Sequence, residues 1–469
     1  MYERLGHKHD VDVRNGTCES MSGEDLPPAG QYVQVRRRSH EGVTEHEGMV
    51  IESQHAEQLT IRLVNGYHLV VDTKELDSWE FIDEVDSSRQ FSSPNRPEIN
   101  HDLPSVRLIH TGGTIASQVD YESGAVQARY SAEELLDSVP QIAEIANLST
   151  DQLFNKWSDD LRPKDWNAII QATKRAFDEG ARGVVIAHGT DTMHMSAAAV
   201  AFAWCGKGGR PPGPIVFTGS QRSSDRGSSD AFVNLRAAIE WAAKGPEPTG
   251  EGDGTVIIMH DSLDGGKVAV ISGLSARKMH TSARAAFASI GRETLTNHDL
   301  HASEWNMPEP ETSHRPITDE PDYFLTDLRI LQSMAGPFLL AEHLSQPEEV
   351  DALIIHGTGL GHLPLDVIEA EGMNGDIARK LASYKEAEVP VFVVQQCIRG
   401  PINLDVYSKG RMMQELGVGP ARTTMAPDTA IVKVAYILGH KELTGGLHAA
   451  YQENLAGEMT QALHTPEGW

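Results

Sequence analysis

The sequence has few cysteines, few aromatic residues and no long apolar segment. Its three cysteines, Cys18, Cys205 and Cys397, lie far apart in 469 residues, without metal-ligand spacing. This excludes a disulfide-stapled domain and a cysteine zinc site, and the apolar context of Cys397 predicts an inert core thiol. The apolar runs have the length of strands, so no membrane-spanning helix is expected. The first ten residues lack an apolar signal core, and we therefore expect a cytoplasmic protein.

Positive charge is also scarce. The chain has 40 basic and 67 acidic residues, a formal net charge of −27, and the acidic excess is spread along its length with lysine in the minority among the basic residues. This balance argues against a chain that by itself grips a nucleic acid backbone. It is typical of proteins adapted to molar salt, where screening removes most of the repulsion. We therefore predict a halophilic source.

Changes in composition predict four segments. Residues 1–29 are polar and are expected to form a disordered tail. Residues 30–92 contain short alternating strands and predict a small antiparallel β-barrel of SH3-like size. Its one tight basic cluster, Arg36 to Arg38, is either a solvated face or a contact for RNA or an acidic partner. After a linker rich in serine and proline come two α/β domains, residues 104–306 and 323–469, which are joined by a second proline-rich linker.

Within the α/β region, strand-like runs alternate with helical patterns. Such alternation is typical of a mostly parallel sheet covered by helices, in which ligands bind at the carboxyl ends of the strands. The predicted strands are 106–110, 183–188, 214–218, 255–260, 352–356 and 390–395. The predicted helices are 132–147, 163–179, 195–204, 230–243, 377–385 and 430–439.

Several predicted strands end in histidine, and two of them continue as His-Gly-Thr. These are His188-Gly189-Thr190 and His356-Gly357-Thr358. We interpret the repeat as strand ends that reach one edge of a sheet, with histidines that pack and form hydrogen bonds in preference to acting as catalytic bases.

Two hydroxyl-rich turns carry the first chemical signal. In Thr111-Gly112-Gly113-Thr114, the absence of Cβ atoms lets backbone N–H groups approach a ligand, and the Thr114 hydroxyl is a candidate nucleophile. In Thr190-Asp191-Thr192, a hydroxyl adjoins a carboxylate after a strand. Alone, the first is an ordinary glycine-rich turn and the second a helix cap. On neighbouring strands, the two turns would converge on one cleft.

Lys278 supplies the third signal. It lies in a polar loop between apolar and hydroxyl residues. A lysine held near a threonine and an aspartate can shuttle a proton and so activate a hydroxyl, whereas the alternative is an ordinary surface lysine.

Together these segments resemble the asparaginase and glutaminase amidohydrolases that use a threonine nucleophile. The resemblance covers residues 104–460 and implies an asparaginase-like α/β fold of two domains with parallel sheets. The motifs that carry it are Thr111 to Ile115, Val139 to Ile142, His188 to Thr192, Phe217 to Arg222, and Lys278.

The resemblance also implies roles for individual residues. Thr114 would attack the side-chain amide carbon and form an acyl-enzyme, while Lys278 and Asp191 tune Thr190 in a second catalytic group. Asp191 would also hold the substrate α-amino group, Ser158 the α-carboxylate, and the backbone N–H groups at Gly113 the oxyanion. A lid tyrosine would assist Thr114. Tyr121 fits this role better than Tyr130.

About 100 residues precede the nucleophile strand, whereas free asparaginases begin almost directly at it. This layout, with residues 120–126 and 425–433, is similar to the D-subunit branch of archaeal glutamyl-tRNA(Gln) amidotransferases. The branch implies a glutaminase that passes ammonia to an E subunit, in a heterotetramer of two D and two E subunits around a D homodimer. Glu-tRNA(Gln), ATP and Mg²⁺ would bind mainly to the E subunit, and this chain would need no cofactor or metal.

Three other interpretations compete with this one. A stand-alone L-asparaginase with an added barrel would turn over asparagine without a partner. A non-catalytic scaffold would not need Thr114, Thr190, Asp191 and Lys278 together. A dinucleotide site at the Gly-Gly turn is excluded because no G-x-G-x-x-G follows the strand.

Overall fold

The chain divides into two compact units, Met1–Ser93 and Pro94–Trp469. The structure, a computed structural model, describes residues 26–28, 30–39, 42–51, 58–63, 68–82, 100–113, 117–119, 126–128, 140–222, 229–262, 266–300, 305, 313–365, 372–443 and 445–459.

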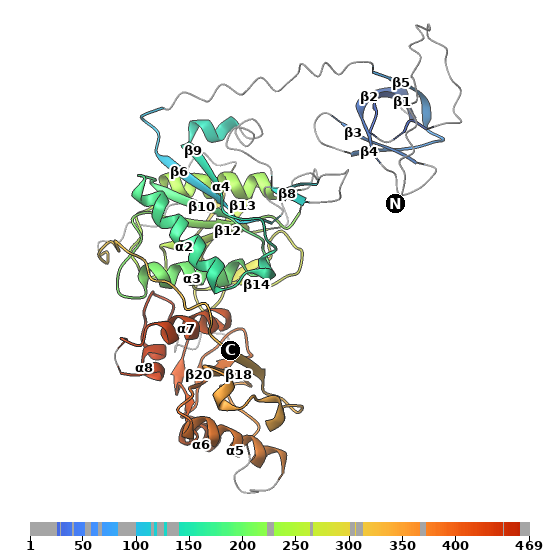
Figure 1. Cartoon of the computed structure of the whole chain (residues 1–469). Coiled ribbons are helices and arrows are strands. Elements are labelled where there is room, and N and C mark those ends of the chain that lie inside the picture. Colours follow the sequence, from blue (N-terminus) through green and yellow to red (C-terminus); the bar gives the residue numbers. More distant parts are fainter. Residues whose placement is uncertain are drawn as a thin grey trace, which may run out of the picture. The chain divides into compact units, whose positions relative to one another are not determined.

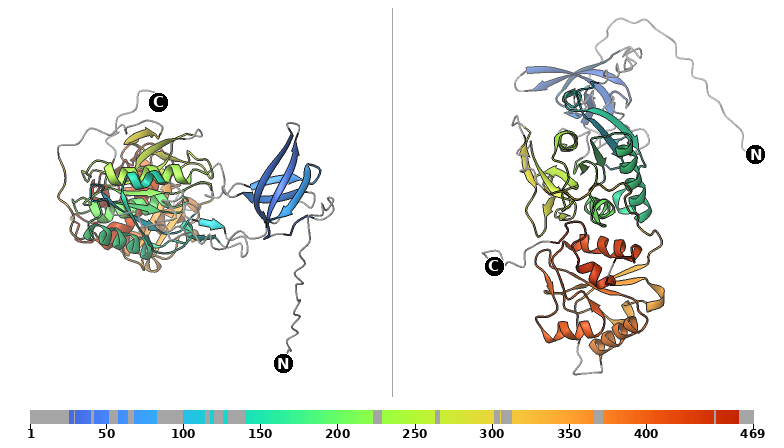
Figure 2. Two further views of the ribbon diagram at one scale, coloured as in Figure 1. Left: turned by 90° about the horizontal axis from the view of Figure 1, so that it is seen from above. Right: turned by 90° about the vertical axis from the view of Figure 1, so that its left-hand side faces the viewer.

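The first unit contains a five-stranded antiparallel sheet in the order β4-β3-β2-β1-β5 (Figure 1). Figure 2 shows how strongly this sheet curls. Alternate residues such as Val33, Val35 and Ile61 face a small core, as the period of two predicts. The strands are β1 (Tyr32–Ser39), β2 (Gly42–Ile51), β3 (Gln58–Leu63), β4 (His68–Asp72) and β5 (Leu76–Phe81). The sequence did not predict β5, because it is polar and largely exposed.

The arginine cluster of the first unit lies on β1, between β2 and β5. Each arginine forms an ion pair with a carboxylate. The pairs are Arg36–Glu45 (2.7 Å), Arg37–Glu75 (2.8 Å) and Arg38–Asp77. Neighbouring carboxylates therefore neutralise the charge of the cluster. This favours the interpretation of the cluster as a solvated face over that of a contact for RNA.

The second unit contains a seven-stranded sheet in the order β16-β13-β12-β11-β10-β6-β9. Strands β9, β6, β10, β11 and β12 are parallel, whereas β13 pairs antiparallel with both β12 and β16, so the sheet is mixed but mostly parallel, as predicted. The strands are β6 (Ser105–His110), β9 (Asn147–Gln152), β10 (Gly183–Ala187), β11 (Ile215–Thr218), β12 (Thr255–His260), β13 (Lys267–Ser272) and β16 (Thr296–Asp299).

Helices cover both faces of this sheet (Figure 1). On β10, Val184 and Ile186 pack towards α2 (Pro163–Asp178) and α3 (Met193–Cys205), while Val185 packs towards α4 (Ala231–Lys244). Helix α2 begins with a proline in its first turn, where no N–H is needed. Helix α3 is apolar around most of its circumference, because α7 (Pro427–Gly439) covers the side that faces away from the sheet.

A second sheet of four parallel strands has the order β17-β18-β19-β21. Residues of α5 and α6 pack on one face and residues of α7 and α8 on the other, where the core is continuous with that of the larger sheet. The elements are β17 (Ile330–Met334), β18 (Ala352–Gly357), β19 (Val391–Gln395), β21 (Val418–Gly419), α5 (Met373–Glu386), α6 (Ser408–Glu415), α7 (Pro427–Gly439) and α8 (Leu447–Gln452).

Short ladders and 3-10 helices complete the described part of the second unit. The ladders pair β7 (Ser117–Val119) with β8 (Val126–Ala128), β14 (Ala276–Lys278) with β15 (Phe287–Ser289), and β20 (Ile402–Asn403) with β22 (Arg422–Thr423). The 3-10 helices are Pro140–Glu144, Ser158–Asp160, Ala341–His343 and Pro347–Glu349.

Two local predictions were wrong. The helix expected over 132–147 lies outside the described residues up to 139, and its remainder is the 3-10 helix Pro140–Glu144 followed by β9, which begins at Asn147. The polar sequence of β9 suits an edge strand and gave no apolar alternation. Cys397 is exposed, because it follows the end of β19 in a surface turn.

In the described ranges, no helix has both the length and the apolar composition needed to cross a bilayer.

Candidate active site

The two hydroxyl-rich turns follow adjacent parallel strands. Strands β6 and β10 pair in register, with His110 opposite Ala187. Thr111 then donates two hydrogen bonds of 3.0 Å, from its backbone N–H and its hydroxyl, to the carbonyl of Ala187. The carboxyl ends of the two strands therefore bring the turns side by side, as the motifs predict.

The Gly-Gly turn is pressed against its neighbours. Gly112 and Gly113 have φ angles of +112° and +85°, which disfavour any side chain. A Cβ on Gly113 would lie 2.7 Å from the backbone N of Gly189, and one on Gly112 would overlap the backbone of Lys156. Only glycines permit this approach. Thr114, which follows Gly113 in the sequence, and the two candidate lid tyrosines, Tyr121 and Tyr130, lie outside the described residues.

Lys278 joins the second turn from a distant part of the chain. The β14–β15 ladder holds its backbone, and its Nζ donates to Thr190 Oγ1 at 2.9 Å and to Asp191 Oδ1 at 2.7 Å. The lysine side chain is 10 % exposed, whereas that of Asp191 is 66 % exposed. Lys278 is thus not an ordinary surface lysine. It can exchange a proton with the Thr190 hydroxyl, while Asp191 keeps an open face for a cationic group.

Ser158 reaches the same place through the 3-10 helix Ser158–Asp160. It is buried, its carbonyl accepts a 2.6 Å hydrogen bond from the Thr192 hydroxyl, and a Cβ on Gly189 would lie 2.9 Å from its Cβ. The structure therefore brings together Gly113, Ser158, Thr190, Asp191 and Lys278, which come from four separate stretches of the sequence.

A buried polar network supports the site from the α4 side. Asp230 accepts the backbone N–H groups of Gln221 and Arg222, and Asn234 donates to the carbonyl of Gly219 at 2.9 Å. His260 Nδ1 lies 2.7 Å from Asn234 Oδ1.

This network fixes the loop beneath the second turn, since a Cβ on Gly219 would lie 3.0 Å from Thr190 Cγ2. Sequence reasoning did not find it, although Asp230 and Asn234 have the i, i+4 spacing that places them together on a helix.

The strand-end histidines near the turns are buried groups. His188 lies between the carbonyl of Gly189 (2.6 Å) and the hydroxyl of Ser196 (2.9 Å). Among the residues whose positions are described, neither ring nitrogen of His110 has a hydrogen-bond partner. Burial lowers the pKa of both histidines to about 4, so both are neutral at pH 7. This agrees with packing roles and argues against catalytic bases.

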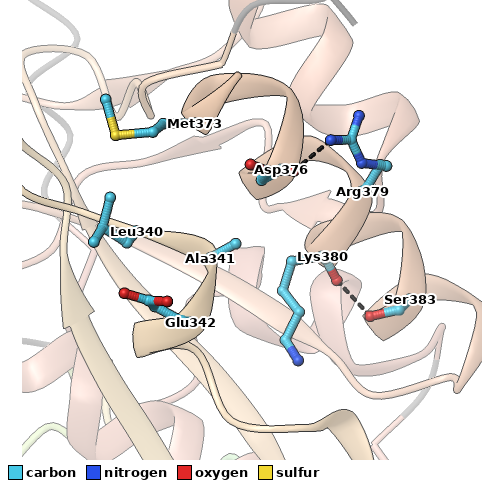
Figure 3. Close-up of a pocket in the computed structure, with 8 residues that line it drawn as sticks. All are labelled: Leu340, Ala341, Glu342, Met373, Asp376, Arg379, Lys380 and Ser383. Atoms are coloured by element: carbon cyan, nitrogen blue, oxygen red, sulfur yellow. Dashed lines mark hydrogen bonds and ion pairs between the residues drawn. The ribbon is translucent and has the colours of Figure 1, made fainter. Parts of the chain in front are cut away.

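A separate cavity of about 620 Å³ lies in the C-terminal part, between α5 and the 3-10 helix Ala341–His343 (Figure 3). Its lining includes Met373 and Leu340 beside the ion pair of Asp376 with Arg379. Lys380 and Ser383 also line it, but their side chains donate to Gln346 Oε1 and to the carbonyl of Lys380, an arrangement unlike the contact of Lys278 with Thr190. Among the residues with described positions, no cluster of His, Cys, Asp and Glu could hold a metal ion.

Comparison with known protein families covers both α/β parts. The family model "Asparaginase, N-terminal" matches residues 105–310, and "Glutaminase/Asparaginase C-terminal domain" matches residues 331–445. A solved structure, the thermostable L-asparaginase from Thermococcus kodakarensis, is similar with a TM-score of 0.61 and 27 % identity. It covers 76 % of this chain and 99 % of that one. The predicted asparaginase-like α/β fold is confirmed.

Other relatives extend further along the chain. The D subunit of glutamyl-tRNA(Gln) amidotransferase from Pyrococcus abyssi is 34 % identical over 441 residues, 92 % of this chain and 94 % of the relative. This alignment is longer than the stretch from Ser105 to Trp469, so it includes part of the first unit. The chain belongs to the family of glutamyl-tRNA(Gln) amidotransferase D subunits. Another member, from Methanothermobacter thermautotrophicus, is 32 % identical over 89 % of this chain and 91 % of the relative. The resemblance seen in the D-subunit layout is thereby confirmed.

Proposed function

We propose that this chain hydrolyses glutamine through a Thr114 acyl-enzyme and supplies the ammonia to a partner E subunit, which converts Glu-tRNA(Gln) to Gln-tRNA(Gln). The observation that carries this proposal is the contact of Lys278 with Thr190 and Asp191 beside the Gly-Gly turn. Membership in the D-subunit family supports the destination of the ammonia.

The chemistry follows from the positions of these groups. The Thr114 oxygen forms a bond to the amide carbon of glutamine and gives its proton to a base in the site. The oxyanion that develops is stabilised by backbone N–H groups at the Gly-Gly turn. When the C–N bond breaks, the leaving nitrogen takes a proton and departs as ammonia. Water then releases glutamate from the threonine ester, with the Lys278–Thr190 pair as the local proton carrier.

Substrate recognition uses the charged and hydroxyl groups around this pair. Asp191, with its open face, holds the α-ammonium group of glutamine, and Ser158 contacts the α-carboxylate. ATP and Mg²⁺ belong to the E subunit in this proposal, and this chain works without a cofactor. The complex contains two D and two E subunits around a D homodimer, the symmetric arrangement that is commonest for such assemblies.

A stand-alone L-asparaginase is the second candidate function. The similarity to the asparaginase from Thermococcus kodakarensis favours it. That similarity covers 76 % of this chain, less than the alignments with the D subunits, so we rank it second. A non-catalytic scaffold ranks third, because it needs no contact between Lys278 and Thr190.

The test measures ammonia release from glutamine and from asparagine by wild type, Thr114→Ala and Thr114→Ser. Each protein is assayed alone and with the E subunit, ATP, Mg²⁺ and Glu-tRNA(Gln). We expect the partner and the charged tRNA to stimulate release from glutamine by wild type. Thr114→Ala should release nothing above background, and Thr114→Ser should retain part of the activity.

Two outcomes would contradict the proposal separately. Full ammonia release by Thr114→Ala would contradict the acyl-enzyme mechanism. Rapid asparagine turnover by wild type, at a rate that the E subunit does not change, would contradict the role in a complex. The chain would then be an amidohydrolase that acts alone.

A further inference from the structure

The first turn of α7 touches both segments that build the Lys278–Thr190 pair. Asp428 is the second residue of this helix and Thr429 the third. Both project towards the larger sheet, although α7 belongs to the C-terminal part of the second unit. We refer to Asp428 and Thr429 together as the α7 clamp.

One set of contacts holds the segment that carries Lys278. The carboxylate of Asp428 lies 2.9 Å from the guanidinium of Arg277, the residue before Lys278 on β14. The hydroxyl of Thr429, which is buried, donates a 2.8 Å hydrogen bond to the carbonyl of Leu274, four residues before Lys278. The α7 clamp therefore contacts the segment that leads to Lys278 at two residues, Leu274 and Arg277.

The same carboxylate also reaches the segment that carries Thr190. Asp428 Oδ2 lies 3.5 Å from Nε2 of His194, which is in the first turn of α3, four residues after Thr190. The His194 ring lies edge-on to Phe287 at 6.5 Å, and Phe287 is the cross-strand partner of Lys278. One carboxylate thus lies against the neighbours of both members of the pair.

These contacts lie at the junction of the two α/β parts, where they are partly shielded from water, since the side chain of Arg277 is 31 % exposed. The side chain of His194 is 9 % exposed and that of Asp428 18 %. Burial by itself raises the pKa of Asp428, but His194, Arg277 and His356 together outweigh this effect and lower it below its ordinary value. Asp428 is therefore an anion at neutral pH, and its attraction to Arg277 is screened less than a surface pair would be.

We propose that Asp428 is a positioning residue for the amide hydrolysis, through which the C-terminal α/β part sets the alignment of Lys278 with Thr190. The inference rests on the proposed function above. Proton exchange between Lys278 Nζ and Thr190 Oγ1 requires their 2.9 Å separation, and the α7 clamp contacts both segments that determine it. Without the α7 clamp, Lys278 and Thr190 are both still present, but the distance between Nζ and Oγ1 increases.

The test compares Asp428→Asn with Tyr436→Phe. Tyr436 lies about two turns further along α7, and its hydroxyl donates to Asp322 at 2.7 Å, away from Lys278 and Thr190. Both variants remove a polar contact of the same helix. We expect Asp428→Asn to lower kcat for glutamine about 10-fold, with partial recovery in Asp428→Glu, while Tyr436→Phe keeps the wild-type kcat at a similar loss of Tm.

A double-mutant cycle adds a second readout. Arg277→Gln should lower kcat as Asp428→Asn does, and the double variant should lose little more than either single variant, because both changes break the same contact. Additive losses, or an equal fall of kcat in Asp428→Asn and Tyr436→Phe, would overturn the positioning role.

The inference can fail independently of the proposed function. If wild type proves inactive on glutamine but active on asparagine, the same variants are compared on asparagine. Amide hydrogen exchange supplies a measurement that needs no activity. Residues 187–196 and 274–279 should lose protection in Asp428→Asn and keep it in Tyr436→Phe. Unchanged protection in Asp428→Asn would overturn the inference even if the chain were a confirmed glutaminase.

Discussion

The tripeptide His-Gly-Thr lies at the carboxyl end of a central parallel strand in each α/β part, but the two threonines have different contacts. After β10, Thr190 accepts a hydrogen bond from Lys278 and adjoins Asp191. After β18, the hydroxyl of Thr358 donates instead to the carbonyl of His362, at 3.1 Å across a tight turn. The strand end supplies a hydroxyl in both places. After β10, however, β14 brings the amine of Lys278 from a distant part of the chain to the threonine hydroxyl.

The largest expected difference concerns the threonines. Thr190→Val should lower kcat for ammonia release from glutamine about 1,000-fold, because it removes the hydroxyl that exchanges a proton with Lys278. Thr358→Val removes a hydroxyl that serves only a turn and should leave kcat unchanged. Steady-state assays of both variants, with Tm as a check on folding, make the comparison. Similar kinetics for the two would show that the Lys278 contact has no catalytic importance.

His188 and His356 should differ in how much each lowers the stability of the folded protein at acid pH. The pKa of His188 is lowered to about 4 by burial, so only the unfolded chain takes up a proton as the pH falls below about 6.5. The folded state therefore loses stability between pH 6.5 and 4, by about 3 kcal/mol for this group, and loses no more from it below pH 4.

The measurement is the Tm of wild type, His188→Gln and His356→Gln between pH 7 and 4. His188→Gln should flatten this dependence. His356 is half-buried and its pKa is also lowered by burial, so His356→Gln should change the slope in the same direction but less. A steeper acid loss in His188→Gln than in wild type would contradict the assignment of His188 as a buried neutral group.

The glycines should give the smallest effect. A Cβ on Gly189 would lie 2.9 Å from the side chain of Ser158, so Gly189→Ala should displace this serine and raise KM for glutamine about 10-fold, if Ser158 holds the substrate carboxylate. A Cβ on Gly357 would meet the backbone of Gly361 at 2.5 Å. Gly357→Ala should therefore lower Tm and leave KM unchanged. An unaltered KM in Gly189→Ala would contradict the proposed role of Ser158 in substrate binding.

Most of the fold could be predicted because its signals are local. The β6 and β10 strands are short apolar runs that end near glycine, and α2 begins at Pro163, where the pattern predicted it. Strands β5 and β9 were not predicted, since each is a polar edge strand whose pairing depends on residues far away in the sequence.

The sequence predicted the residues of the candidate site, but it did not predict the residues that hold them in place. Thr190, Asp191 and Lys278 stand in recognisable motifs, and the structure brings them together. The i, i+4 spacing of Asp230 and Asn234 places them together but does not show which loop they hold. The contact of Asp428 with Arg277, 151 positions earlier, is a tertiary one that no spacing reveals. The roles of Thr114 and Tyr121 and the halophilic source stay predictions.

The paired arginines of the first unit have a consequence for encounters with RNA. A basic surface binds a phosphate backbone largely because the backbone sheds condensed counterions as it meets unpaired positive charge. Arg36, Arg37 and Arg38 already face carboxylates of the same unit. Transfer RNA that touched this face would release few ions, and the logarithm of its association constant would change little with the logarithm of salt concentration. This face therefore offers little of the unpaired positive charge that holds a phosphate backbone.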